Sequence, residues 1–100
     1  MEEIKNYIED IISDSTIGKE KPDAIALLIL YYNTLYPLHV DGETKHVTEI
    51  KVPDAMELLS ISDRRVRKAK KILEDFMLLE NISIKDPETK TIQHYIEMTT

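Results

Sequence analysis

Residues 60–72 carry six of the chain's 13 Lys and Arg side chains and only one of its 19 Asp and Glu side chains. The rest of the chain is acidic, and the formal net charge is −6. Clustered cations attract a polyanion, whereas acidic surroundings repel it from every other face. This segment is therefore where we expect a nucleic acid to bind.

The basic segment has the spacing of an amphipathic helix that runs from about Asp63 to Met77. Ser62 is suited to cap it, and Asp63 complements the helix dipole. At 100° per residue the side chains fall into two groups. The apolar group, expected to pack, is Val66, Ala69, Ile72, Leu73, Phe76 and Met77, and the opposite group is Arg64, Arg67, Lys68, Lys71 and Asp75.

The elements on either side of this helix have sequence signals of their own. Pro53 opens a brief helix over 53–59, with Ala55, Met56, Leu58 and Leu59 expected to point inward, and the turn Ser60-Ile61-Ser62 follows it. After the basic helix, residues 82–85 and 91–98 alternate apolar and polar around a polar turn, which predicts a β-hairpin.

The first half of the chain predicts two further helices and a strand. A helix is expected over residues 22–36, with Pro22 in its first turn. Its residues leave almost no polar face, so this helix is expected to be buried nearly all round. Pro37 should end it, and a loop around 41–43 should lead to a short strand over 47–52.

The N-terminal helix, residues 2–14, places Ile4, Ile8, Ile11 and Ile12 on one stripe. An apolar stripe must be covered by something. Either it joins two subunits of a homodimer, or it folds back on the core of its own domain. Dimerisation would let the protein bind two DNA half-sites, and both possibilities stay open at this point.

The order helix, turn, helix, hairpin, together with the residues in it, resembles the winged helix-turn-helix proteins. The resemblance is carried by Ala55, Leu58 and Ile61-Ser62 at the turn, then by Val66 and by Leu73-Glu74 in the following helix, and it covers roughly residues 47–98. It implies a mainly helical α+β fold, a winged helix with an extra N-terminal helix. The whole chain, 1–100, would form one domain, with residues 1–17 as helix and linker and residues 22–98 as the winged-helix core.

In that family the helix after the turn enters the DNA major groove, and the hairpin wing reaches neighbouring phosphates or the minor groove. Transferred to this sequence, the DNA-binding residues would be Ser60, Ser62, Arg64, Arg65, Arg67, Lys68 and Lys71, with Lys85 and Lys90 on the wing. Arg64 and Arg67 suit base recognition because a guanidinium can bond bidentately to a base edge. The sequence departs from the family where Ser60 replaces a frequent glycine and where the wing tip carries Asp86 and Glu88.

Other chemistries have little support in the sequence. The chain has no cysteine, and His39, His46 and His94 lack the spacing of a metal site. No nucleophile with a base, no glycine-rich phosphate loop and no carboxylate pair stands out, so we expect neither an enzyme nor a cofactor, metal or small-molecule ligand. No apolar run approaches a membrane span and the N-terminus is acidic, so we expect a cytoplasmic protein without membrane contact.

The sequence thus predicts a sequence-specific double-stranded DNA-binding protein, in the first place a transcriptional regulator. A plasmid or viral replication or partition protein would use the same domain. A winged helix that binds another protein is the alternative from a different class, and the acidic net charge and acidic wing tip favour it.

Overall fold

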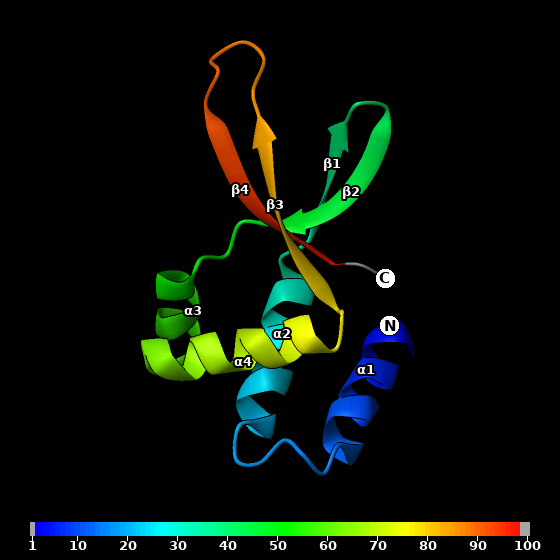
Figure 1. Cartoon of the computed structure of the whole chain (residues 1–100), viewed down its shortest axis with the longest axis vertical. Helices are drawn as coiled ribbons and strands as arrows, with labels where there is room; N and C mark the ends of the chain where they lie inside the picture. The colour runs from blue at the N-terminus through cyan, green and yellow to red at the C-terminus, as the bar shows by residue number, and fades with distance from the viewer. Residues whose placement is uncertain (1, 99–100) are drawn as a thin grey trace.

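The computed structural model describes residues 2–98, and its helices lie below the strands of an antiparallel sheet (Figure 1). Within this range lie four helices and one antiparallel sheet of four strands, which confirms the mixed fold class. In chain order the elements are α1 (Glu2–Ser13), α2 (Lys21–Asn33), β1 (Tyr36–Val40), β2 (Glu43–Thr48), α3 (Val52–Leu59), α4 (Asp63–Asp75), β3 (Leu79–Lys85) and β4 (Ile92–Met98).

Helix α2 lies at the centre of the helical layer, where it packs against α1, α3 and α4. Its Leu27, Leu28 and Tyr31 are almost completely buried in the hydrophobic core. The prediction that α2 is buried nearly all round was too strong, because Ile29 is 39% exposed. One face of α2 therefore forms the centre of the core, and the remainder borders solvent.

Helix α1 folds back on its own domain. Ile4 and Ile11 are buried in the same core as α2, Ile8 is half-buried, and only Ile12, at 54% exposed, lies largely in solvent. The isoleucine stripe is thus mostly covered within the chain. A homodimer formed through residues 2–14 stays a prediction, but it is no longer needed to explain the stripe.

The segment after α2 differs from the sequence prediction. The helix ends at Asn33 rather than at 36, and residues 36–40 form the strand β1, which was not predicted. Asp41 and Gly42, with φ of 49° and 81°, connect β1 to β2 in a two-residue turn between the paired residues Val40 and Glu43. Asp-Gly favours this turn because both central residues need positive φ.

The strand predicted over 47–52 is wrong in its bounds, because β2 occupies 43–48 and only Val47 and Thr48 belong to both. These two buried residues are also the only ones in β2 that pair with β4, opposite Glu97 and Ile96. The alternation of polar and apolar residues over 49–52 was interpreted as a strand, but these residues form the connection into α3 and its first residue, Val52.

The C-terminal hairpin is confirmed, and β3 begins three residues earlier than predicted. Strands β3 and β4 pair from Leu79–Met98 to Lys85–Ile92, and the sheet order is β1-β2-β4-β3. Because β2 and β4 pair over so few residues, the two hairpins diverge from a common base above the helices (Figure 1).

Two side chains that were expected to pack inward point to solvent instead. Leu58 of α3 is 60% exposed and Met77 is 81% exposed. Helix α4 ends at Asp75, and Met77 then takes a left-handed conformation with φ of 60°. This conformation turns the chain so that Leu78 and Leu79, rather than Met77, are buried.

Candidate nucleic-acid interface

The turn between α3 and α4 sets the direction of the basic helix. Ser60 ends α3 in a left-handed conformation with φ of 55°, and the Ile61 N–H donates to the Met56 carbonyl at 3.2 Å. Ser62 is the N-cap, as predicted: its Oγ accepts a hydrogen bond from the Arg65 N–H at 3.3 Å. Such a cap satisfies one of the N–H groups that have no partner inside the helix.

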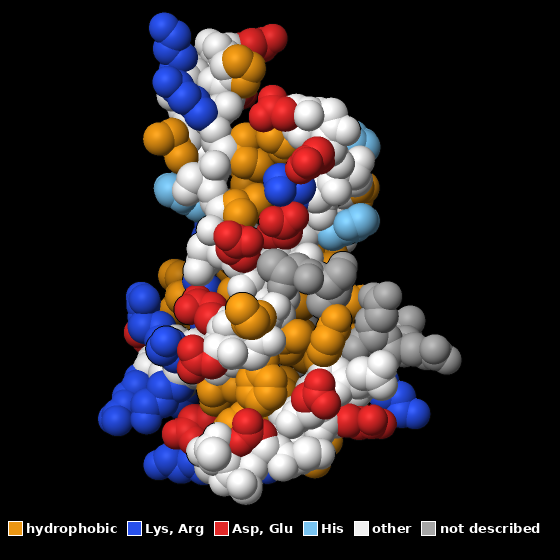
Figure 2. Space-filling view, turned by 45° about the vertical axis from the view of Figure 1, so that its right-hand side comes forward, with side chains coloured by type: hydrophobic (Ala, Val, Ile, Leu, Met, Phe, Trp, Pro, Cys, Tyr) orange, Lys and Arg blue, Asp and Glu red, His pale blue; other side chains and the backbone are white. Residues whose placement is uncertain are grey.

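Helix α4 packs through Val66, Ala69 and Leu73, all fully buried, which confirms the centre of the predicted packing face. Arg64, Arg67, Lys68 and Lys71 are exposed. In Figure 2, Lys and Arg side chains gather at the lower left, on the side where α3 and α4 lie in Figure 1. The structure therefore brings the four cations together on one helix.

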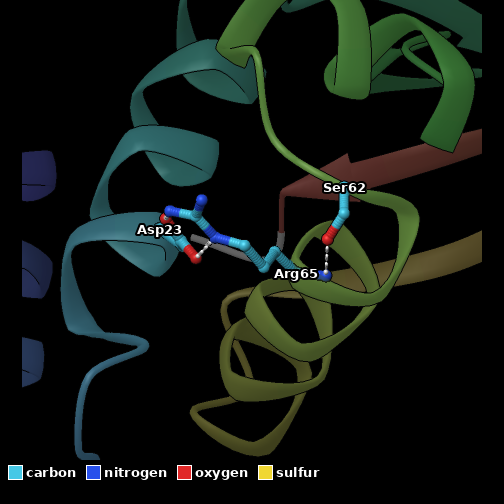
Figure 3. Close-up of polar contacts among 3 residues, drawn as sticks. All are labelled: Asp23, Ser62 and Arg65. Carbon is cyan, nitrogen blue, oxygen red and sulfur yellow. Dashed lines mark hydrogen bonds and ion pairs between the residues drawn. The ribbon is translucent and has the colours of Figure 1, made fainter.

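Arg65 has a different environment from its neighbours on α4. Its Nε and Nη2 donate to the two carboxylate oxygens of Asp23 on α2, at 2.8 and 2.7 Å (Figure 3). The Asp23 side chain is only 10% exposed. The hydrogen bonds from Arg65 lower the pKa of Asp23, and the same bonds raise the pKa of Arg65. Arg65 thus fixes the start of α4 against α2.

Three of the four cations Arg64, Arg67, Lys68 and Lys71 have carboxylate partners. Arg67 Nε lies 2.6 Å from Asp63 Oδ1, and Lys71 Nζ lies 3.2 Å from Asp75 Oδ1, both one helical turn apart. The bond to Asp63 raises the pKa of Arg67. Exposed ion pairs of this kind contribute little to stability, so little free energy is needed to separate them. The two cations therefore remain available to bind a phosphate.

Lys68 pairs across elements, with its Nζ 3.6 Å from Glu20 Oε1 at the start of α2. The Arg64 side chain, in contrast, makes no hydrogen bond or ion pair with the side chains described for residues 4–98 or with the described backbone. Arg64 is therefore the cation on the exposed face whose charge is least compensated within the fold.

Lys85 and Lys90, which were predicted to lie on a wing, are exposed near the tip of the β3–β4 hairpin, which extends away from α4 (Figure 1). The structure does not bring them next to the α4 cations. Asp86 has a local function there, since its Oδ1 accepts from the Glu88 N–H at 2.8 Å and its backbone pairs with Lys90 and Thr91. The acidic residue at this hairpin tip is thus explained in part by the geometry of the turn.

Sequence reasoning missed the contribution of residues 19–23 to this interface. Glu20 and Asp23 contact Lys68 and Arg65 only because α2 packs against α4. No local pattern signals such a contact between residues far apart in sequence.

The three histidines lie apart on the two hairpins. His39 Nδ1 is 2.9 Å from Thr44 Oγ1 and His94 Nδ1 is 2.9 Å from Ser83 Oγ, each pair sitting on neighbouring antiparallel strands. Among residues 4–98, whose side chains the structure describes, no group of three or more His, Cys, Asp or Glu side chains is placed to hold a metal ion. In the same range, no helix combines the length and the apolar character needed to cross a membrane.

Comparison with known proteins adds no relative. No protein-family model matches the chain, and neither a curated protein nor a solved structure is significantly similar to it.

Proposed function

We propose that this chain is a winged-helix domain that binds double-stranded DNA in a sequence-specific manner, as a regulator of transcription does. The observation that carries the proposal is the division of α4 into a buried apolar face and an exposed cationic face. Val66, Ala69 and Leu73 are fully buried, whereas Arg64, Arg67, Lys68 and Lys71 are exposed.

The way a helix fits the DNA major groove supports this proposal. The B-DNA major groove accepts one α-helix, and exposed Arg and Lys side chains on it reach base edges and phosphates. Arg64 lies in the first turn of α4. Since helix-turn-helix proteins contact DNA with the N-terminal residues of this helix, Arg64 is well placed to contact the duplex, and Arg67, one turn further on, is the better placed to read a base.

The order of elements also supports the proposal. A core helix, a short strand, two helices joined by a tight turn and a terminal hairpin are the parts of a winged helix, and α2, β2, α3, α4 and the β3–β4 hairpin follow each other in this order. Helix α1 and strand β1 would be additions to it. The wing would contribute Lys85 and Lys90 to phosphate contacts.

The test is a fluorescence anisotropy titration with duplexes enriched from a random pool. The double variant Arg64→Ala/Lys68→Ala should bind more weakly than the wild type. Its matched control is Lys5→Glu on α1, which changes the net charge by the same amount on an exposed residue of another helix. If the double variant and the control have the same affinity as the wild type, or if no duplex is enriched, the proposal fails.

The alternative of a protein-binding winged helix has one observation in its favour. Arg67, Lys68 and Lys71 are each paired with a carboxylate, which reduces the net charge that the helix presents. A protein partner would not require the steep salt dependence that phosphate binding shows, because only phosphate binding releases condensed counterions.

A further inference from the structure

A pocket of about 400 Å³ lies where the first turn of α2 meets the first turn of α4. Its walls come from the α1–α2 linker and α2 on one side and from α4 on the other. The lining residues are Lys19, Glu20, Asp23, Arg64, Arg65 and Lys68. Four of these six carry positive charge, and two carry negative charge.

Both carboxylates in the pocket are already engaged. Asp23 accepts two hydrogen bonds from Arg65, and Glu20 pairs with Lys68 at 3.6 Å. The side chains of Lys19 and Arg64 make no hydrogen bond or ion pair within the described part of the chain. The pocket therefore has two uncompensated cations from two different segments, which is the arrangement that attracts an anion.

Two helices begin at this pocket, since Glu20 is the N-cap of α2, and Arg64 and Arg65 belong to the first turn of α4. Helix N-termini carry partial positive charge and N–H groups without intrahelical acceptors. The Ser62 hydroxyl accepts a hydrogen bond from the N–H of Arg65 and from no other N–H of the first turn of α4. The dipoles thus add to the field of the uncompensated side chains.

The linker that carries Lys19 is held in place at both ends. Lys21 Nζ donates to the Ile12 carbonyl of α1 at 2.6 Å, and the Thr16 N–H donates to Asp14 Oδ1 at 2.7 Å. The Thr16 hydroxyl also donates to Asp14 Oδ1, and these hydrogen bonds from the hydroxyl and the N–H of Thr16 lower the pKa of Asp14. Lys19 is therefore on a fixed segment beside the basic helix.

From this arrangement we propose that the pocket binds a backbone phosphate of duplex DNA, so that the α1–α2 linker forms a second contact beside α4. This inference rests on the proposed function. Lys19 and Arg64 would contact the phosphate oxygens, and Glu20 would compete with the phosphate for Lys68. The linker residue Lys19 thereby extends the interface beyond the helix-turn-helix.

The proposal requires substitutions at neighbouring positions to have opposite effects. Lys19→Ala should weaken binding to all duplexes alike and lower the slope of log affinity against log salt by about 0.9, the value expected for one phosphate contact. Glu20→Gln removes the competing charge at nearly constant shape, so it should strengthen binding. Lys5→Ala on α1 is the control that removes one cation outside the pocket.

The measurement is an anisotropy titration of these three variants and the wild type, with circular dichroism to verify that each is folded. A second readout is an amide NMR titration of the wild type with duplex DNA and, separately, with inorganic phosphate. The proposal expects the duplex to shift the resonances of Lys19 and Arg64. If shifts at these residues arise with inorganic phosphate only, the pocket is a small-anion site and the proposal is wrong.

A wild type that binds no duplex overturns the proposed function together with this inference. A wild type that binds, with Lys19→Ala indistinguishable from Lys5→Ala and Glu20→Gln indistinguishable from the wild type, overturns the pocket proposal alone.

Discussion

Replacing Leu73 by alanine should strongly destabilise the domain, because Leu73 is fully buried where α4 packs on α2. The substitution removes three carbon atoms, each worth about 0.8 kcal/mol of transfer free energy. The cavity left behind adds to this loss, so we expect the free energy of unfolding to fall by about 3–4 kcal/mol. For a domain of this size that corresponds to a fall of about 15 °C in Tm.

The matched substitution is Leu58→Ala on α3, which deletes the same atoms from a side chain that is 60% exposed. Its cost should stay below about 1 kcal/mol, since most of the side chain is already in water. Urea denaturation followed by circular dichroism measures both. Similar losses in the two variants, or a larger loss for Leu58→Ala, would show that the packing of α3 and α4 described above is wrong.

Three further substitutions test other parts of the structure. Ser60→Gly should raise the free energy of unfolding by about 0.5–1 kcal/mol, because a left-handed residue costs about 1–2 kcal/mol and glycine avoids this at a smaller entropic cost; a loss of stability in urea would contradict the left-handed turn. Ile11→Ala should cost about 2–5 kcal/mol even in a monomer, since Ile11 is fully buried; an unchanged urea midpoint would place α1 outside the core. Asp23 has a lowered pKa because Arg65 donates hydrogen bonds to it, so its contribution is present above the unfolded value of about 3.9 and is lost as the pH falls through the folded value. Asp23→Asn should therefore lose less stability than the wild type on acidification below about pH 4, and parallel pH profiles would refute this.

The helices and the C-terminal hairpin were predictable because their signals are local. Val66, Ala69 and Leu73 recur at helical spacing, and the strands of the hairpin alternate on either side of a polar turn. Strand β1 was missed because Pro37 was interpreted only as the end of a helix. Proline is tolerated on an edge strand, and β1 is at the edge of the sheet.

The partners of the basic residues could not be predicted. Periodicity placed Arg64, Arg65 and Lys68 on α4, but it could not show that Arg65 turns towards Asp23 or that Lys68 meets Glu20. Those contacts depend on how α2 crosses α4. The predicted burial of Leu58 and Met77 was wrong for a related reason, since an apolar residue near a helix end is buried only if another element lies over it.

The salt dependence of duplex binding tests the central claim, that the exposed face of α4 contacts DNA phosphates, most directly. Removing the cations of Arg64 and Lys68 should lower the slope of log affinity against log salt by about 1.8. Between 50 and 200 mM salt, the ratio of wild-type to double-variant affinity should therefore shrink by a factor of about 12. The charge-matched Lys5→Glu control should keep the wild-type slope. Parallel lines for the wild type and Arg64→Ala/Lys68→Ala would contradict the account.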